Sequence, residues 1–465
     1  MVQGASSWAG KSLLVTALAR HYARRGLRVA PFKGQNMSNN ARVGRGGEMG
    51  AAQYLQALAA GVEPDVRMNP VLVKPEGETR SQVVTLGRAD LGFSRMPWRE
   101  RAPALWPIVH AALRSLAEDH DLLLVEGAGS PAEINLRDSD LANMRVARTA
   151  DAAVVIVADI DRGGAFAHLY GTWALLDPAE RRRVGGFVLN RFRGDPALLA
   201  PAPERLEALT GAPVVGVLPW LAHDLPDEDG AAHGPGTEAA GPTVAVVRYP
   251  SASNLDELRP LEQVASVRWA RRPDDLDGAD LVILPGSKHV AADLAWLRRR
   301  GLDRALARRA AAGRRLLGIC GGLQMLGERL EDPDGVDGEG PALALLPLTT
   351  TFASAKVVRR ARARFGDLPE PWRALSGRSA GGYEIRHGRT RATGPVAEAL
   401  PEGLGYVRGA VLGVYLHGLL ENADVVRALL GRAPARDLEA TFDLLADAVE
   451  AHLDTARLDA LAGLP

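Results

Sequence analysis

The sequence MVQGASSWAGKS, residues 1–12, decides how the first part of this 465-residue chain folds. Gly4 is followed by five residues and then by Gly10, Lys11 and Ser12, which open a stretch of helix-forming residues. Such glycines let backbone N–H groups surround phosphate oxygens, while the lysine reaches the terminal phosphates and the hydroxyl binds magnesium. The stretch therefore predicts a strand, an ATP-binding phosphate loop one residue longer than usual, and a helix. A Gly- and Ser-rich helix start that binds nothing is the plainer alternative.

Apolar runs and amphipathic stretches alternate along the chain after this loop. The short, β-branched runs predict buried parallel strands, and the stretches between them predict helices, which together indicate βαβ units. The strands are expected at 28–32, 122–125, 153–158, 186–189 and 214–218, and the helices at 11–25, 48–60, 102–118 and 196–209. The first part of the chain is therefore expected to be a doubly wound α/β domain.

A second α/β domain is expected after a change in composition. Residues 224–242 are acidic and then rich in Gly, Pro and Ala, without apolar periodicity, which is typical of a linker. New strand-like runs follow at 243–247, 281–284, 315–319 and 412–416. The fold class is thus α/β with two doubly wound domains, at 1–223 and 243–465, joined by the linker 224–242.

The overall composition excludes several classes of protein. Basic and acidic residues number 56 each, so the formal net charge is zero and no global field favours nucleic acid or an anionic membrane. No apolar run approaches the roughly 18 residues of a membrane span, no signal peptide opens the chain, and the single cysteine cannot form an intramolecular disulfide. We therefore expect a cytoplasmic protein that acts on small molecules. Association with a second copy of the chain is left open.

Acidic side chains follow two of the expected strands, where open α/β sheets place nucleotide sites. Glu126 follows one strand, and Asp159 and Asp161 follow another. Together with Ser12 they supply the oxygen ligands that magnesium prefers, although an acidic N-cap of the next helix would explain Asp161 equally well. Asn190 follows a third strand, and its amide suits the edge of a nucleotide base unless it is only a turn residue.

An uncharged amide cluster, FKGQNMSNNA at 32–41, follows the second expected strand. Amides donate and accept hydrogen bonds at once, so the loop suits a substrate whose rim carries both carboxylates and carboxamides. The candidate substrate-binding residues are Lys33, Gln35, Asn36 and Asn39. A plain Asn-rich turn is the alternative.

The only cysteine lies in RRLLGICGGLQMLGERL, between an apolar run and a helix-forming stretch. A small-x-Cys-x-small turn lifts the thiol of Cys320 above a sheet at a helix N-terminus, which favours the nucleophilic thiolate over an inert core cysteine. The N–H of Gly321 and an N–H of the turn Gly286–Ser287 are candidates for an oxyanion hole. His417, after another strand of the same sheet, is the candidate base, and His387 is its rival.

Nine motifs stand in order between residue 1 and about residue 425. They are MVQGASSWAGKS, FKGQNMSNNARV, VEGAGSPAEINL, ADIDRGG, LNRFRGD, LPGSKH, GICGGLQMLG, GGYEIRHGRT and VYLHGLLEN. Together they resemble the cobyric acid synthase family, the glutamine-dependent amidases of cobalamin biosynthesis. The resemblance implies an N-terminal dethiobiotin-synthetase-like P-loop domain and a C-terminal class I glutamine amidotransferase domain.

The resemblance also implies an activity and its residues. The family amidates the b, d, e and g carboxylates of adenosylcobyrinic acid a,c-diamide to give adenosylcobyric acid, consuming glutamine and ATP. Its nucleophile falls on Cys320 and its histidine on His417. Lys11 and Ser12 fall on its P-loop, and Glu126 falls on a glutamate that faces magnesium. ATP and Mg²⁺ are thus the implied cofactors, and glutamine and a corrinoid are the implied small-molecule partners.

Two features of the chain depart from common patterns. Most class I amidotransferases continue with His-x-Glu, which orients the imidazole, but Gly418 and Leu419 follow His417 here. Glu421 or a backbone carbonyl is then the candidate for that orienting role. In addition, only three residues precede the phosphate loop, so we expect the first strand to be continued by residues upstream of Met1.

Two other functions are weighed against this one. Cobyrinic acid a,c-diamide synthase has the same two domains and acts on different carboxylates, but the amide-rich loop at 32–41 favours the cobyric acid synthase family. A P-loop switch ATPase, with an inactive thiol domain that serves as a binding module, is the alternative from another class. The presence of both Cys320 and His417 argues against it.

Overall fold

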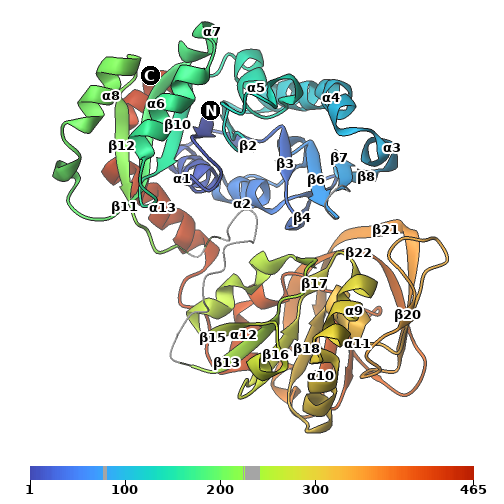
Figure 1. The fold of residues 1–465 in the computed structure, drawn as a ribbon. Helices are drawn as coiled ribbons and strands as arrows, with labels where there is room; N and C mark the ends of the chain where they lie inside the picture. The colour runs from blue at the N-terminus through green and yellow to red at the C-terminus, as the bar shows by residue number, and fades with distance from the viewer. Residues whose placement is uncertain (77–80, 224, 226–240) are drawn as a thin grey trace. The chain divides into compact units, whose positions relative to one another are not determined.

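The computed structural model describes residues 1–76, 81–223, 225 and 241–465 (Figure 1). Contacts divide the chain into unit 1, which consists of Met1–Ser38, Gly44–Glu228 and Asp437–Pro465, and unit 2, which consists of Asn39–Val43 and Asp229–Arg436. Most of the expected linker, 224 and 226–240, lies outside the described residues. The expected domain boundaries differ from these units in two places, because 437–465 belongs to unit 1 and 39–43 belongs to unit 2.

Parallel strands form the centre of unit 1. They are β1 (Val2–Gly4), β2 (Val29–Phe32), β9 (Leu122–Val125), β10 (Val154–Asp159), β11 (Val184–Phe192) and β12 (Val214–Pro219). An isolated parallel bridge between Val2 and Glu126 sets β9 beside β1, so the strand order is β2-β9-β1-β10-β11-β12. The expected doubly wound fold is confirmed, and the carboxyl end of β1 is the point where such a sheet leaves a crevice for a ligand.

The helices of unit 1 include one at each of the four expected ranges, with two differences, and others outside those ranges. They are α1 (Lys11–Arg24), α2 (Ala51–Ala59), α3 (Leu91–Arg95), α4 (Trp98–Asp119), α5 (Met144–Thr149), α6 (Ala165–Leu175), α7 (Pro178–Arg181), α8 (Ala202–Thr210), α13 (Leu438–His452) and α14 (Thr455–Ala462). The helix expected at 48–60 begins later, because its first residues form a strand. The helix expected at 196–209 is interrupted at Pro201, whose nitrogen carries no hydrogen for an intrahelical bond.

A second group of strands lies beyond β2 in the sequence and was not expected. It contains β3 (Gln35–Met37), β4 (Ala41–Gly44), β5 (Gly47–Gly50), β6 (Val71–Pro75), β7 (Ser81–Thr85) and β8 (Arg88–Asp90). The order β3-β6-β7-β8 forms one small sheet, with β3 parallel to β6 and the other pairs antiparallel. These strands are short and half of their residues are polar, so their apolar pattern is weak.

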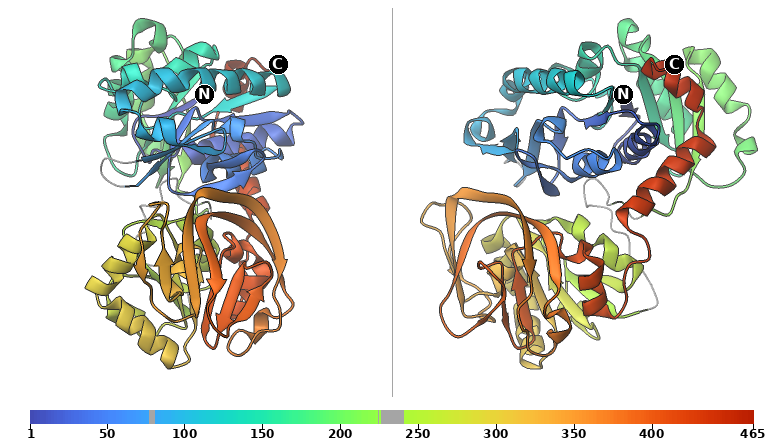
Figure 2. Two further views of the ribbon diagram at one scale, coloured as in Figure 1. Left: turned by 90° about the vertical axis from the view of Figure 1, so that its right-hand side faces the viewer. Right: turned by 180° about the vertical axis from the view of Figure 1, so that it is seen from behind.

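The two C-terminal helices pack on unit 1 (Figure 2). Helix α13 lies against α1, where Arg20 donates to Asp443 at 2.7 Å and Arg24 donates to Asp447 at 2.6 Å. The apolar side of α13 joins the core of unit 1 through Phe442, Leu445 and Val449. The amphipathic pattern of α13 requires an apolar partner but does not identify it, so its return to the first unit could not be read from the sequence.

A larger sheet forms the centre of unit 2. Its strands, in spatial order, are β15 (Ser266–Ala270), β13 (Thr243–Val247), β16 (Leu281–Leu284), β18 (Leu316–Ile319), β25 (Val411–Val414), β24 (Gly405–Arg408) and β23 (Ala397–Leu400). The first five are parallel and the last two are antiparallel. The expected second α/β sheet is therefore confirmed, and β18, which leads to the cysteine, lies in its middle.

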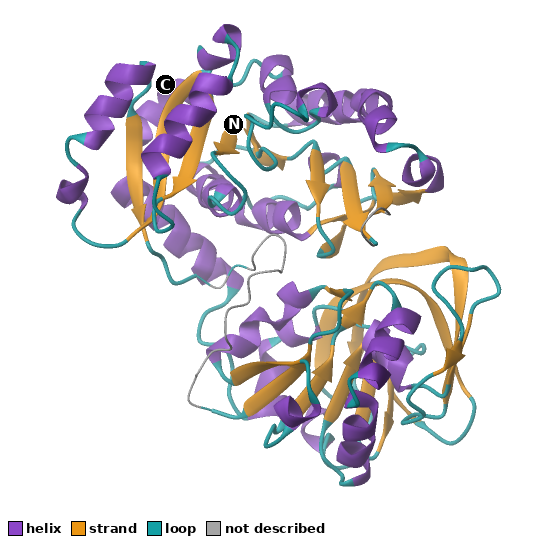
Figure 3. Ribbon diagram, in the orientation of Figure 1, coloured by secondary structure: helices purple, strands orange, loops and turns teal. Residues whose placement is uncertain are grey.

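Helices and smaller strands complete unit 2 (Figure 3). The helices are α9 (Val290–Arg299), α10 (Leu302–Ala311), α11 (Gly321–Leu326) and α12 (Ala423–Leu430). The strands are β14 (Ala252–Ser253), β17 (Gly286–Ser287), β19 (Arg329–Glu331), β20 (Gly340–Pro341) and the long antiparallel pair β21 (Leu348–Arg364) and β22 (Ser379–Ala392). None of the helices in the described part of the chain is both long and apolar enough to cross a membrane.

Gly322, in the first turn of α11, lies very close to strand β16. A Cβ added to Gly322 would lie 2.0 Å from the carbonyl oxygen of Leu284, which is backbone of the central sheet. We therefore expect Gly322→Ala to lower the free energy of unfolding of unit 2 by about 1–3 kcal/mol. Gly171→Ala in α6, where a Cβ meets nothing within 4 Å, is the matched control and should leave stability unchanged or slightly higher. Calorimetry compares the two variants, and equal melting temperatures would contradict the expectation.

Candidate functional site

The sole cysteine lies at the carboxyl end of the central strand β18. Cys320 immediately precedes α11 and has a positive φ of 52°. A non-glycine residue with positive φ is uncommon and costs energy, so it persists only where the surroundings hold it. Because β18 runs between β16 and β25, the segments that follow those two strands reach the same edge of the sheet as the thiol.

His417, which follows β25, is the histidine that contacts the thiol. Its side chain is 2% exposed, and its Nδ1 lies 2.8 Å from Oε1 of Glu257. The other carboxylate oxygen of Glu257 accepts a hydrogen bond of 2.7 Å from the N–H of Gly418. A carboxylate accepts only, so Nδ1 donates to Glu257 and Nε2 is left for Cys320. The three side chains form a thiol, imidazole and carboxylate series.

The residue that orients His417 is not the one expected. Glu421, the candidate from the sequence, pairs with Arg42 at 2.5 Å instead, and a backbone carbonyl is not the partner of Nδ1 either. Glu257 belongs to the 3-10 helix η4 (Leu255–Gln263), 160 residues before His417. It is one of several acids in a short amphipathic stretch, and no sequence spacing connects it to the histidine.

The environment of His417 favours its charged form. Burial lowers its pKa, but the charges of Glu257 and Cys320 and their hydrogen bonds to the ring raise it more, so the pKa rises from 6.5 to about 10. The imidazole beside Cys320 is therefore a cation at neutral pH. A neighbouring cation and the N-terminus of a following helix both favour a thiolate, which is the nucleophilic form of cysteine.

The expected oxyanion residues lie around the same thiol. A Cβ added at Gly286 would lie 3.1 Å from Cε1 of His417, and one added at Gly321 would lie 2.6 Å from the nitrogen of Ser287. The structure thus brings the turn Gly286–Ser287 and the start of α11 together beside the imidazole. His387 is the rival base. Its Nδ1 lies 3.0 Å from a backbone carbonyl oxygen of β21.

The phosphate loop of unit 1 connects β1 to α1, as the sequence predicts. Gly10 has a φ of 101°, and a Cβ there would lie 2.0 Å from Nδ2 of Asn190. Asn190, expected to meet a nucleotide base, donates to a carbonyl of the loop at 3.0 Å and so holds the loop in place. Lys11 is 3% exposed, and its Nζ donates to the carbonyls of Ser6 at 3.3 Å and Gly129 at 3.1 Å.

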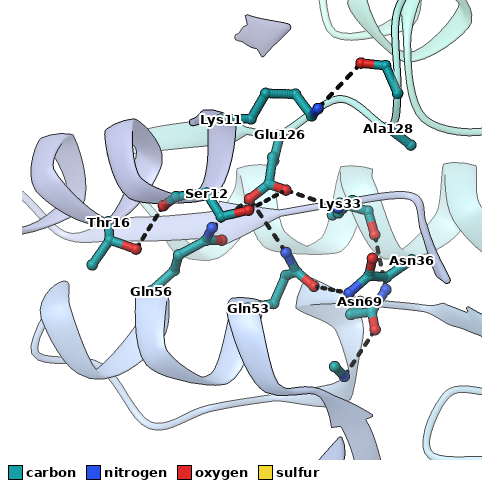
Figure 4. Close-up of polar contacts among 12 residues, drawn as sticks. Lys11, Ser12, Thr16, Lys33, Asn36, Gln53, Gln56, Asn69, Glu126 and Ala128 are labelled. Carbon is teal, nitrogen blue, oxygen red and sulfur yellow. Dashed lines mark hydrogen bonds and ion pairs between the residues drawn. The ribbon is translucent and has the colours of Figure 1, made fainter. Parts of the chain in front are cut away.

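A fully buried carboxylate, Glu126, collects side chains from three segments of unit 1 (Figure 4). Its Oε1 accepts from the hydroxyl of Ser12 at 3.0 Å and from Nζ of Lys33 at 2.8 Å. Its Oε2 accepts from the amides of Gln53 and Gln56 on α2. The loop, the second strand and α2 therefore converge on one charged group at the switch point of the sheet.

The glutamines of α2 were missed from the sequence, although a signal existed. Gln53 and Gln56 stand three residues apart in AAQYLQALAA, so they share one face of an otherwise apolar, mostly buried helix. Polar groups buried at such spacing need partners, and here these are Glu126 and the amide of Asn36, which donates to Gln53 at 3.1 Å.

The four candidate substrate residues of the amide-rich loop have different surroundings. Lys33 and Asn36 belong to the polar network around Glu126. Gln35 is half-buried in β3, and Asn39 belongs to unit 2 by its contacts. A binding role for these residues toward a corrinoid therefore stays a prediction.

The acids at the end of β10 and just after it, Asp159 and Asp161, pair with arginines. Asp159 accepts from Arg191 at 2.8 Å and lies 3.2 Å from Arg162, while Asp161 lies 3.2 Å from Arg193. Among the residues that the structure describes, no group of three or more His, Cys, Asp or Glu could hold a metal ion.

Magnesium needs only one or two protein oxygens when phosphates supply the others. The hydroxyl of Ser12 and the carboxylate of Glu126, 3.0 Å apart beside the phosphate loop, are a pair of hard oxygen donors of the kind that this ion prefers. The residues of this site therefore fit a nucleotide with magnesium. Asp159 and Asp161 lie in ion pairs with arginines, and their role toward magnesium stays a prediction.

Comparisons with known proteins cover both parts of the chain. A family model for the CobQ/CobB/MinD/ParA nucleotide binding domain matches residues 1–228, and one for the CobB/CobQ-like glutamine amidotransferase domain matches residues 243–425. The cobyric acid synthase of Polaromonas sp. is 53% identical over 100% of this chain and 98% of its own length. Those of Variovorax paradoxus and Paracidovorax citrulli are 56% and 57% identical, over 99% and 98% of this chain and 98% and 97% of their own lengths.

A solved glutamine amidotransferase matches 44% of this chain and 98% of its own length, at 17% identity. Its TM-score of 0.31 is too low to indicate the fold of this chain. The full-length relatives do indicate the family, since more than half of the aligned positions are the same along the whole chain. Taken with the thiol site of unit 2 and the phosphate loop of unit 1, this similarity shows that the chain belongs to the cobyric acid synthase family.

Proposed function

We propose that this chain amidates the b, d, e and g carboxylates of adenosylcobyrinic acid a,c-diamide, with ATP and with ammonia taken from glutamine. One observation carries the proposal: a single chain of this family contains both a buried thiol, imidazole and carboxylate series and a phosphate loop beside a hydroxyl and a buried carboxylate. The first suits hydrolysis of an amide, and the second suits phosphoryl transfer. Unit 2 then acts as the glutaminase and unit 1, with its C-terminal helices, as the synthetase.

Glutamine hydrolysis begins at the thiol. The thiolate of Cys320 attacks the side-chain carbonyl carbon of glutamine, and the developing oxyanion receives hydrogen bonds from N–H groups of Gly321 and of the turn Gly286–Ser287. His417 gives its proton to the departing nitrogen, which leaves as ammonia. The same imidazole then takes a proton from water, which attacks the thioester and releases glutamate. Glu257 keeps the ring in the required orientation throughout.

Activation of the corrinoid carboxylate takes place at the phosphate loop. A carboxylate is a poor electrophile, so its oxygen first attacks the terminal phosphoryl group of ATP, which releases ADP and gives an acyl phosphate. Ammonia then attacks the acyl carbon, displaces phosphate and, after loss of a proton, leaves the amide. Lys11 and the N–H groups of the loop hold the phosphates in line and stabilise the charge that gathers during transfer. Magnesium, held by Ser12 and Glu126, would supply further positive charge there. Lys33 adds a fixed cation beside Glu126.

Mass spectrometry of the products tests the proposal directly. The protein is incubated with the corrinoid, ATP, magnesium and glutamine, and the number of successive amidations is counted. Four amidations are the expected result. No amidation of the a,c-diamide together with two amidations of cobyrinic acid would indicate cobyrinic acid a,c-diamide synthase instead. ATP hydrolysis without amidation of either corrinoid would indicate a P-loop switch with a binding domain.

Removing the charge of Glu257 is expected to weaken glutamine hydrolysis. Glu257→Gln keeps the shape of the side chain, but its amide can donate to Nδ1 and stabilise the wrong tautomer, so we expect kcat to fall by about 100-fold. Glu262→Gln, a residue of the same η4 helix that pairs with Arg259, is the matched control and should keep its activity. Equal glutaminase rates in the two variants would remove Glu257 from the site.

The same pair predicts how stability depends on pH. The pKa of His417 is raised in the folded protein, so the stabilisation from its charged form is complete below about pH 6.5 and is lost as the pH rises through about 10. Thermal melts of Glu257→Gln between these values should show a smaller loss of stability with pH than melts of the wild type. A steeper loss in the variant would contradict the assigned pairing.

A further inference from the structure

The last five residues of the motif FKGQNMSNNARV, Asn39–Val43, belong to unit 2 by their contacts. Ala41 and Val43 are buried there. The carbonyl of Ala41 accepts from Nδ2 of Asn254 at 2.8 Å, and the carbonyl of Val43 accepts from Nε of Arg360 at 3.0 Å. The segment is therefore packed into unit 2, the proposed glutaminase.

Arg42, the central side chain of this segment, is buried between two carboxylates. Its Nε donates to Asp256 at 3.0 Å, and its Nη2 lies 2.5 Å from Glu421. The side chain of Arg42 is 5% exposed, and that of Asp256 is fully buried. Asp256 immediately precedes Glu257 in η4, so Arg42 fixes the turn that carries the partner of His417.

The guanidinium also contacts the other side of the catalytic imidazole through Tyr383. Arg42 lies over the Tyr383 ring at 5.3 Å, and that ring stacks on His417 with centroids 5.3 Å apart and planes 19° apart. Tyr383 and His417 exchange two backbone hydrogen bonds of 2.9 and 3.0 Å. Asn254, which holds Ala41, also donates to the Tyr383 hydroxyl at 2.9 Å. One arginine thus supports both neighbours of His417.

We propose that Arg42 is a positioning residue for glutamine hydrolysis, which acts on His417 through the Asp256–Glu257 turn and through Tyr383. The proposal rests on the proposed function of the thiol site. Without the guanidinium, the fully buried carboxylate of Asp256, next to Glu257, and the partly exposed carboxylate of Glu421 would both lose their cation. An uncompensated buried charge shifts or draws in water. Lysine cannot replace the planar fork that meets both carboxylates and the ring at once.

Steady-state kinetics of Arg42→Met in the full chain test the positioning role. We expect kcat for glutamine hydrolysis to fall about 10- to 100-fold, with the KM for glutamine little changed and ammonia-dependent amidation within about twofold of wild type. Arg42→Lys should recover part of the loss. Arg45→Met is the matched control: its arginine lies three residues away, is largely exposed and pairs with Asp65, so its glutaminase rate should stay at wild type.

Different outcomes separate the failure of this inference from the failure of the proposed function. Wild-type glutamine hydrolysis in Arg42→Met would overturn the positioning role. An equal loss of glutamine- and ammonia-dependent amidation would also overturn it, since that pattern indicates general damage. Absence of all amidation in the wild type would instead reject the proposed function of the chain.

Discussion

Cys320→Ala is expected to abolish glutamine-dependent amidation while ammonia-dependent amidation persists. The substitution removes the nucleophile, and the chain contains no other cysteine that could replace it. Loss of a covalent nucleophile costs at least about 10⁴-fold in kcat. The phosphate loop, Ser12 and Glu126 are untouched, so ammonium supplied at mildly alkaline pH, where more of it is unprotonated, should restore all four amidations. Product masses with each nitrogen donor give the measurement.

The single cysteine also provides a matched control for this experiment. Alkylation of the wild-type thiol with iodoacetamide should reproduce the phenotype of Cys320→Ala, and the same treatment should leave the variant unchanged. Loss of both activities in a folded variant would mean that the cysteine is structural or that the two reactions are locked together. Full glutamine-dependent activity would refute a thiol mechanism.

Lys11→Arg is expected to lose most ATP-dependent amidation with either nitrogen donor. The ammonium group of Lys11 lies inside the loop, hydrogen-bonded to two backbone carbonyls, and a Cβ at Gly4 would come within 3.0 Å of it. A planar guanidinium is too wide for that space and cannot act as a point charge between phosphates. We expect the amidation rate to fall about 100-fold. Glutamine hydrolysis should survive in part.

Lys356→Arg is the matched control for this change. It makes the same substitution in β21, which belongs to unit 2 and not to the unit that contains the phosphate loop, and should amidate at the wild-type rate. The rates of ammonia-dependent amidation and of glutamine hydrolysis are measured for both variants. Near wild-type amidation by Lys11→Arg would remove Lys11 from the phosphate site.

Much of the fold could be predicted because it depends on local pattern. The runs at 122–125, 243–247 and 281–284 form strands with the expected bounds, since short β-branched segments between turns favour buried strands. The phosphate loop was equally readable, because its glycines, lysine and serine act within a few residues of one another. The small sheet of β3, β6, β7 and β8 was missed because half of its residues are polar.

The residues of the candidate site also differ in whether the local sequence could predict them. Cys320 and His417 were identified from the turns around them, and the sheet order places them together. Glu257 was not identified, because its role arises from a contact across 160 residues. Gln53 and Gln56 were overlooked although their spacing on an apolar helix was visible.

By itself, the sequence determined most strands of the two central sheets, the nucleotide motif, the thiol motif and the family to which the chain belongs. Only the tertiary structure decided that α13 packs on unit 1, that Arg42 pairs with Asp256 in unit 2, and that Glu257 hydrogen-bonds to His417. The physical reason is that propensity and turn chemistry act between neighbours in the chain. An amphipathic face or a buried charge, in contrast, requires a partner without specifying it, and packing of the whole chain selects which one it meets.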